Sequence, residues 1–372
     1  MTGKVLAFDT SNYTTSVAAA DLAGNILADE RQLLSVKEGD RGLRQSHALF
    51  QHVERLPLLV EQVIKQVGRD DFLAVAVSDR PRPLEGSYMP VFRAGVNLAR
   101  TLAAVLGVPL YRFSHQEGHI AAVCGALADD VRTVSFHMSG GTGEILTTCG
   151  CRPQQIIGGI RDLSFGQLID RVGVALGHSF PAGAALDRIA CAEIPKEGFS
   201  YSSRGNTKIA DPVTGTIHTE GACANLSGIE TQFIRDIEKQ KLRCKECPGE
   251  KAGDGRGVSE YFEKYERKLI LELFCRISDA IVKISQNAMK AADTDTIIFV
   301  GGVSSSAFLR SELPRRLEAE GYRAVFGEPR FSSDNACGIA RLGAAYYLKE
   351  ELKEKRGNAK MGSGGILAGS DI

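Results

Sequence analysis

The sequence predicts an α/β protein with two lobes, because a similar series of strands and helices occurs twice along its 372 residues. Each series runs strand, strand, strand, helix, strand, helix. The first series begins with the apolar run Val5 to Asp9, and the second begins with Val131 to Met138. A chain of this length suits two domains. Ligands usually bind where strand ends meet a cleft, so we expect a binding cleft between the lobes.

Short apolar runs and one helical stripe define the first series. The run from Leu73 to Val77 predicts a buried strand, and Gly24-Asn25 predicts a tight turn between two strands. The expected strands are Val5 to Asp9, Ser16 to Ala20, Asn25 to Glu30, Leu73 to Val77 and Pro109 to Ser114, and the expected helices are Gln45 to Val67 and Arg93 to Gly107.

The second series contains longer helices and one long irregular segment. Residues 194–221 are rich in Gly, Ser, Thr and Pro, which predicts a loop with short strands. The last residues, 356–372, have the composition of a disordered tail. The expected strands are Val131 to Met138, Glu144 to Cys149, Gln155 to Ile160, Thr296 to Val300 and Arg323 to Phe326, and the expected helices include Phe165 to Leu176, Pro181 to Cys191, Ser259 to Ala292 and Asn335 to Lys355.

Composition excludes several classes of protein. Hydrophobic residues make up 43% of the chain, which is enough for a substantial core. Lys plus Arg and Asp plus Glu both number 45, and this balance argues against a protein that coats nucleic acid by bulk charge. No apolar run is long enough to span a membrane, and the N-terminus lacks a signal-peptide pattern. We therefore expect a cytoplasmic protein without a membrane partner.

Two histidines, His115 and His119, lie four residues apart in the sequence HQEGH. On a helix this spacing places both imidazoles on one face, as two ligands of one metal ion require. The alternative is one histidine in the core and one on the surface. Asp334 precedes the last expected helix, where an aspartate commonly caps the helix N-terminus, and a cap can also be a ligand.

Two glycine-rich turns, Ser139-Gly140-Gly141 and Gly301-Gly302, each follow an expected strand. Glycine lets backbone N–H groups approach phosphate oxygens without a side chain in the way. Either turn alone is typical of an ordinary tight turn. Two such turns at strand ends, far apart in the sequence, favour a nucleotide held between the lobes.

Acidic residues at two other places are candidates for ligand contacts. Asp9 and Ser11 follow the first strand in the sequence DTSNYTTS, where they could face phosphate and magnesium or form a surface turn. Asp170 could accept hydrogen bonds from ribose hydroxyls or pair with Arg171 in solvent. The residue types alone leave both alternatives open.

Two cysteine pairs and one charged run have weaker interpretations. Cys244 and Cys247 could form half of a zinc site, with Cys149 and Cys151 as the other half, although no spacing rule links the two pairs. The run Lys239 to Lys251 mixes basic and acidic residues, which predicts a solvated loop.

Seven motifs, taken together and in order, resemble those of the TsaD family. They are FDTSNYTTSVA, HQEGH, MSGG, FGQLIDRVGVALG with FPAGAALDRIA, ANLSGIET, GGVSSSAFLR and SSDNACGIA, and the similarity runs from about Val5 to Tyr347. The resemblance implies the two-lobed ASKHA fold of actin, Hsp70 and sugar kinases, with duplicated RNase H-like domains. It implies a first lobe of residues 1–125, completed by a helix at about 334–355, and a second lobe of residues 126–333.

The resemblance also implies an activity: transfer of threonylcarbamoyl from threonylcarbamoyl-AMP to the exocyclic amine of a tRNA adenosine beside the anticodon. The implied ligands are one iron or zinc ion and ATP or threonylcarbamoyl-AMP. The implied partners are tRNA and TsaB-like and TsaE-like accessory proteins. By motif, His115, His119 and Asp334 would hold the metal ion. Asp9 and Ser11 would be catalytic. The implied substrate contacts are His137, Met138, Ser139, Gly140, Gly141, Asp170, Gly183, Asp187, Gly301, Gly302 and Ser306.

The chain departs from the family pattern at several polar positions. An Asp-Glu pair is replaced by Tyr13-Thr14, a His-Thr pair by Thr142-Gly143, and an Asn by Ser306. These changes indicate a diverged paralogue and keep two other hypotheses open: a non-catalytic nucleotide-binding scaffold or regulator, and an ASKHA transferase with a different acceptor. Peptidase activity is disfavoured, because HQEGH lacks a glutamate directly after its first histidine, where HExxH has its general base.

Overall fold

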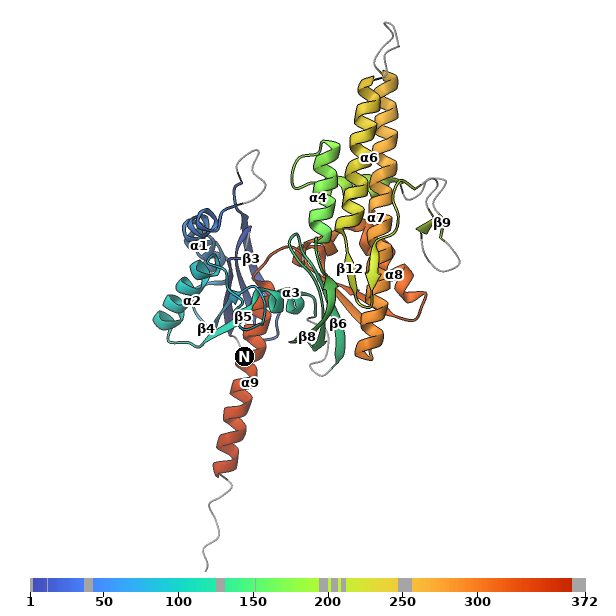
Figure 1. Cartoon of the computed structure of the whole chain (residues 1–372). Helices are drawn as coiled ribbons and strands as arrows, with labels where there is room; N and C mark the ends of the chain where they lie inside the picture. The colour runs from blue at the N-terminus through green and yellow to red at the C-terminus, as the bar shows by residue number, and fades with distance from the viewer. Residues whose placement is uncertain are drawn as a thin grey trace, which may run out of the picture. The chain divides into compact units, whose positions relative to one another are not determined.

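The computed structural model describes residues 3–11, 13–36, 43–124, 131–150, 152–193, 200–201, 207–208, 212–246 and 256–362. The chain divides into two compact units. Unit 1 consists of Met1–Gly125 and Asp334–Ile372, and unit 2 consists of Ala126–Ser333. Each unit contains a mixed sheet covered by helices, so the predicted α/β class is confirmed (Figure 1).

Unit 1 is built on a five-stranded sheet. Its elements are β1 (Lys4–Asp9), β2 (Thr14–Asp21), β3 (Ile26–Leu33), α1 (Gln45–Val67), β4 (Phe72–Arg80), α2 (Phe92–Leu106), β5 (Leu110–Ser114), α3 (His115–Cys124) and α9 (Cys337–Gly362). The strand order is β3-β2-β1-β4-β5. β1 pairs antiparallel with β2 and parallel with β4, and β4 pairs parallel with β5.

Both faces of the unit 1 sheet are buried, because successive side chains of a strand point to opposite faces. Leu6 and Phe8 of β1 belong to the core cluster formed with α1 and α2. Val5 points to the other face, where it and Ala76 leave no room for a side chain on Gly343 of α9. This burial explains why β1 is a continuous apolar run in the sequence.

The parallel strands of unit 1 determine where its polar residues gather. β1 and β5 both run parallel to β4, so their C-terminal ends emerge at the same edge of the sheet. β1 ends at Asp9, and β5 passes directly into His115 at the start of α3. Residues far apart in the sequence thereby meet at one edge.

Unit 2 repeats the strand order of unit 1 within a larger sheet. Its elements are β6 (Arg132–Met138), β7 (Gly143–Cys149), β8 (Arg152–Ile160), α4 (Phe165–Leu176), α5 (Gly183–Glu193), β9 (Ser200–Tyr201), β10 (Thr207–Lys208), β11 (His218–Glu220), β12 (Cys223–Asn225), α6 (Ser227–Glu246), α7 (Arg256–Ala292), β13 (Thr296–Val300), η1 (Gly302–Ser305), α8 (Ala307–Glu318), β14 (Arg323–Phe326) and η2 (Pro329–Phe331). The sheet order is β11-β12-β8-β7-β6-β13-β14. The strands β8-β7-β6-β13-β14 pair in the same directions as β3-β2-β1-β4-β5, so the five-stranded core is duplicated.

The charged run that starts at Lys239 differs from its prediction. Its first part is helical, since α6 continues to Glu246, and it was expected to be a solvated loop. The helix forms because its apolar residues recur every four positions, and Ile229, Phe233 and Ile237 are buried in the core of unit 2. Cys151 and Cys247 lie outside the described residues, so the four-cysteine zinc site stays a prediction.

The C-terminal segment also differs from its prediction. Helix α9 extends to Gly362, so residues 356–362 are helical, whereas a disordered tail was expected from position 356. Lys, Glu, Arg and Ala dominate the preceding turns, and these residues favour helix extension. Residues 363–372 lie outside the described part of the chain. No described helix combines the length and the apolar character that a membrane span requires.

Candidate metal centre

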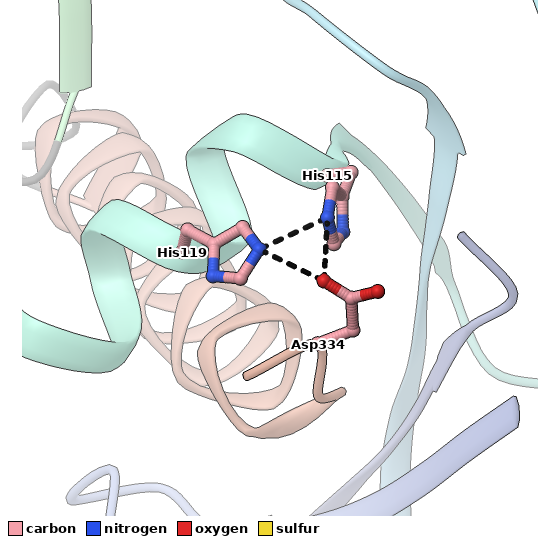
Figure 2. A group of neighbouring side chains, drawn as sticks. All are labelled: His115, His119 and Asp334. Carbon is pink, nitrogen blue, oxygen red and sulfur yellow. Dashed lines mark hydrogen bonds and ion pairs between the residues drawn. The ribbon is translucent and has the colours of Figure 1, made fainter. Parts of the chain in front are cut away.

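Three side chains of unit 1 converge on one another (Figure 2). His115 and His119 lie one turn apart on α3, and Asp334 lies just before α9. The two histidine Nε2 atoms are 3.0 Å apart, and each is 3.4 Å from Oδ1 of Asp334. Within the described residues, these three form the one group of His, Cys, Asp or Glu whose ligand atoms could reach a single metal ion.

The spacing of these three atoms fits a divalent ion. With metal–ligand bonds of about 2.1 Å, neighbouring ligand atoms are about 3.0 Å apart in octahedral geometry and about 3.4 Å apart in tetrahedral geometry. The observed separations of 3.0 and 3.4 Å lie at these values. Two imidazoles and one carboxylate suit both zinc and iron(II), so the donor set agrees with either metal.

The start of α3 is fixed by a reciprocal capping arrangement. Ser114 is the residue before the helix, and its backbone N–H and hydroxyl both donate to Oε2 of Glu117, at 2.6 and 2.7 Å. The N–H of Glu117 donates back to the Ser114 hydroxyl at 3.2 Å. This capping box places His115 at the first position of the helix. The pattern S-x-x-E in SHQE would have revealed it in the sequence, but it was not predicted.

A close crossing of α3 and α9 brings Asp334 to the two histidines. An added Cβ on Gly338 would lie 1.8 Å from the backbone oxygen of Gly118 and 2.8 Å from the N of Ala122. Because these are backbone atoms, any side chain at Gly338 would push the helices apart. The start of α9 is held as well, since the Ala336 N–H donates to the Ser16 hydroxyl at 2.9 Å. Neither contact was predicted, and only the small size of residue 338 hints at the crossing.

Asp9 completes the charged cluster of unit 1 behind His115. Its Oδ2 lies 2.8 Å from Nδ1 of His115, and the carboxylate is 1% exposed. Burial would raise the pKa of Asp9, but the interaction with His115 outweighs burial and lowers it. Burial would lower the pKa of His115, but Asp9 and Asp334 raise it to about 10.

The pKa values of the other two side chains of the cluster are both lowered. Burial and the nearby charge of His115 lower the pKa of His119. Burial would raise the pKa of Asp334, but its hydrogen bonds to both histidines hold that pKa well below the usual range. In the absence of an ion, His115 therefore carries the proton at neutral pH, and a metal ion must displace it.

The two predicted glycine-rich turns lie next to each other in unit 2. β6 and β13 are parallel neighbours, with His137 opposite Val300, so the turns that follow them leave the same sheet edge. Gly301 has φ +91°, and an added Cβ would lie 2.5 Å from the backbone oxygen of Met138. The structure thus brings together His137 to Gly141 and Gly301-Gly302, which are more than 150 positions apart in the sequence.

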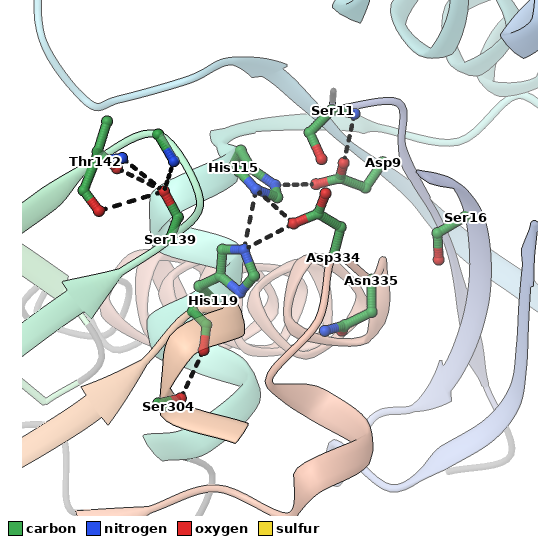
Figure 3. A network of polar contacts seen from close by, with 12 residues as sticks. Asp9, Ser11, Ser16, His115, His119, Ser139, Thr142, Ser304, Asp334 and Asn335 are labelled. Atoms are coloured by element: carbon green, nitrogen blue, oxygen red, sulfur yellow. Dashed lines mark hydrogen bonds and ion pairs between the residues drawn. The ribbon is translucent and has the colours of Figure 1, made fainter. Parts of the chain in front are cut away.

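Hydrogen bonds within the first turn use some of its backbone donors (Figure 3). The N–H groups of Gly141 and Thr142 donate to the hydroxyl of Ser139 at 3.2 and 2.9 Å. The carbonyl of Gly140 accepts from the hydroxyl of Ser164 at 2.8 Å. In this conformation two N–H groups that could meet a phosphate are directed at a side chain of the turn itself.

The other predicted substrate contacts form two separate pairs in unit 2. Asp170 accepts from the N–H groups of Ala182 and Gly183 at 2.8 and 3.3 Å, and burial raises its pKa. Asp187 accepts from the Ser306 hydroxyl and from the first two N–H groups of α8, at 2.8 and 3.2 Å. Both aspartates hold helix starts, and their ligand roles stay predictions, as does the cleft between the lobes.

Comparison with known proteins agrees with the motif order. The family model for TsaD, tRNA N6-adenosine threonylcarbamoyltransferase, matches residues 32–341. A tRNA N6-adenosine threonylcarbamoyltransferase of Anaeromyxobacter sp. (strain Fw109-5) is 26% identical over 355 residues, covering 94% of this chain and 96% of the relative. The enzyme of the same name from Geotalea uraniireducens (strain Rf4) is 25% identical over 354 residues, covering 94% and 92%.

Solved structures support the fold. The crystal structure of full-length HypF in its phosphate- and nucleotide-bound form aligns with a TM-score of 0.52 at 13% identity, over 94% of this chain and 47% of HypF. HypF is an ASKHA-type protein, so this likeness and the duplicated sheet confirm the predicted ASKHA fold. Because the TsaD model spans most of the chain and the relatives align along nearly all of it, the chain belongs to the TsaD family.

Proposed function

We propose that this protein transfers a threonylcarbamoyl group from threonylcarbamoyl-AMP to the exocyclic amine of a tRNA adenosine next to the anticodon, assisted by an iron or zinc ion. The observation that carries this proposal is that His115 Nε2, His119 Nε2 and Asp334 Oδ1 lie at mutual distances that fit the ligands of one metal ion. Membership of the TsaD family supports the general activity on tRNA.

The reaction joins the adenosine amine to the carbamoyl carbon. A C–N bond forms, the bond from that carbon to the phosphate oxygen breaks, AMP leaves, and the amine loses a proton. A metal ion bound to His115, His119 and Asp334 would act as a Lewis acid toward the phosphate or carbonyl oxygen. The adjacent turns at Ser139 to Gly141 and Gly301-Gly302 would hold the phosphate end, and holding both reactants lowers the entropic barrier.

The proposal is tested by reconstitution. The purified chain is mixed with TsaB-like and TsaE-like partners, threonylcarbamoyl-AMP and unmodified tRNA, and the modified nucleoside is measured by mass spectrometry. We expect product from the wild type, loss of product with a chelator or with His115→Ala, and recovery when zinc or iron(II) is restored to the wild type. If a TsaD relative makes product under these conditions and this chain makes none, the proposal is wrong.

A second function, nucleotide binding without transfer, is favoured by the replaced polar positions of the family pattern. Thr142 stands where the family has histidine, and Ser306 stands where it has asparagine. A scaffold or regulator would bind ATP or the adenylate in calorimetry and make no product with any acceptor. Product on an acceptor other than tRNA would instead identify an ASKHA transferase of different specificity. In either case we expect the protein to act in the cytoplasm.

A further inference from the structure

Asp9 is a buried acidic residue beside the metal centre, and both of its carboxylate oxygens are engaged (Figure 3). Oδ1 accepts from the backbone N–H of Ser11 at 2.8 Å. Oδ2 lies 2.8 Å from Nδ1 of His115. Because a carboxylate can only accept, Nδ1 is the donor in this contact. Both oxygens are therefore engaged within unit 1, and the catalytic role expected of Asp9 stays a prediction.

We propose that Asp9 is a positioning residue for the metal centre, which keeps the proton of the neutral His115 ring on Nδ1 so that Nε2 presents its lone pair to the ion. In a neutral imidazole one nitrogen carries the proton and the other carries a free lone pair. A hydrogen bond that holds the proton on one nitrogen therefore leaves the lone pair on the other. Nε2 of His115 is the atom that lies beside Nε2 of His119 and Oδ1 of Asp334. The inference rests on the metal site of the proposed function.

The fold holds Asp9 in place without help from an ion. Asp9 is the last residue of β1, and His115 follows β5, which is two strand positions away, or about 9.6 Å. The hydrogen bond between the two side chains spans this gap. The next residue, Thr10, donates to the carbonyl of Val91 at 3.0 Å and accepts from the N–H of Gly95 at 3.3 Å. The strand end is thus fastened to α2, and the carboxylate is preorganised.

Two other roles for Asp9 fit the geometry less well. A direct metal ligand would have an oxygen among the converging ligand atoms, and Asp9 is not part of that group. A general base must reach the proton that it removes, but Asp9 is 1% exposed and its two oxygens are occupied by Ser11 and His115. The contact with His115 is the one through which Asp9 can act on the site.

The substitution Asp9→Asn separates the proposed role from simple anchoring of the turn. The asparagine oxygen can still accept from the Ser11 N–H, which directs the amide NH₂ toward His115. An NH₂ group donates, so it favours a lone pair on Nδ1 and moves the proton of the neutral ring to Nε2, where it blocks the metal. Loss of such a supporting partner commonly lowers metal affinity by about 10- to 100-fold.

Asp21→Asn is the matched control. Asp21 ends β2 and also anchors a turn, because it accepts from the backbone and side-chain N–H groups of Asn25, both at 2.9 Å. It is not among the converging ligand atoms. We expect zinc affinity, measured by competition with a chromogenic chelator and corrected for the proton that each variant releases, to fall by about 10- to 100-fold in Asp9→Asn and to stay at the wild-type value in Asp21→Asn.

A spectroscopic measurement on the wild type tests the same inference without a variant. In the zinc-loaded protein, ¹⁵N chemical shifts should show His115 protonated at Nδ1 and metal-bound at Nε2. The inference is overturned if His115 binds zinc through Nδ1. It is also overturned if the zinc affinity of Asp9→Asn lies within about threefold of the wild-type affinity, a change well below the usual effect of such a partner.

Wild-type protein that binds no zinc or iron(II) overturns both the inference and the metal part of the proposed function. A chain that binds zinc as expected but transfers nothing to tRNA overturns the transferase proposal alone.

Discussion

The two units share a five-strand order but use their polar residues in different ways. In unit 1, two imidazole nitrogens face each other at 3.0 Å beside a carboxylate, an arrangement that is complementary to a cation. In unit 2, Asp170 and Asp187 are satisfied by backbone N–H groups of the unit itself. The comparison teaches that the fold supplies matching sheets, and individual side chains decide which unit can hold a metal ion.

The two sets of polar residues also differ in energetic terms. Asp9 and His119 are 1% and 3% exposed, and burying charged or polar groups costs free energy unless partners compensate. Hydrogen bonds to the backbone stabilise unit 2 whether or not a ligand is bound. In unit 1, an ion that replaces the proton on His115 would join His115, His119 and Asp334 through one centre. We therefore expect metal-dependent stability in unit 1 alone.

The largest effect is expected from removing one metal ligand. His119→Ala leaves one imidazole and one carboxylate, which make a poor site, so zinc affinity should fall by about a thousandfold or more. Zinc should also lose its stabilising effect in urea denaturation followed by circular dichroism. His218→Ala, a histidine of unit 2 outside the cluster, is the control and should retain wild-type affinity. Equal affinity in both variants would mean that the cluster in unit 1 is not the metal site.

The next effect concerns the crossing of α3 and α9. Gly338→Ala places a methyl group against backbone atoms of Gly118, so we expect unit 1 to lose about 1–3 kcal/mol of stability. Zinc affinity should fall as well, because the helix that follows Asp334 shifts away from the two histidines. Gly228→Ala in α6 meets no atom within 4 Å and should change neither quantity. A stable Gly338→Ala variant with normal affinity would show that the crossing does not position the ligands.

The third effect is the pH dependence of zinc binding at the metal centre of unit 1, where zinc competes with a proton. The pKa of His115 is raised to about 10 in the metal-free protein, so at pH 7 the ring is protonated and each bound ion releases one proton. Zinc affinity should therefore rise about tenfold per pH unit from pH 7 toward 9, and flatten as the pH passes the pKa of His115. Calorimetry in buffers of different ionisation enthalpy measures the released proton. An affinity that is constant over this range would contradict the assigned protonation.

Much of this architecture could be predicted from the sequence, because apolar periodicity reports burial directly. The limits of α1, α4 and β13 agree with those predicted, since each element buries a regular stripe or an unbroken apolar run. The pair of histidines on α3 was predicted as well, from its spacing of four. Periodicity does not report contacts between elements that are far apart in the sequence, such as the hydrogen bond between Asp9 and His115.

The predictions that differ from the structure have local physical causes. The charge of the run after Lys239 obscured the buried stripe of α6, which begins earlier in the sequence. The closeness of α3 and α9 depends on the absence of a Cβ at Gly338, and a single glycine carries no such signal. The ligand role predicted for Asp187 stays a prediction, and its hydrogen bonds with Ser306 and the start of α8 were not predicted, because they join elements far apart in the sequence.

The smallest effect is expected from substitution of Asp187, which tests whether this residue of unit 2 acts only as a helix cap. Asp187→Ala removes the acceptor for two N–H groups at the start of α8, and loss of such a cap costs about 1 kcal/mol of stability. Zinc affinity should stay at the wild-type value, because the metal ligands belong to unit 1. Asp187→Asn keeps one acceptor and should lose less stability than Asp187→Ala. ATP affinity, measured on both variants by calorimetry, separates the cap from a ligand contact: a cap alone predicts unchanged affinity, whereas a loss of affinity without loss of stability would make Asp187 part of a nucleotide site.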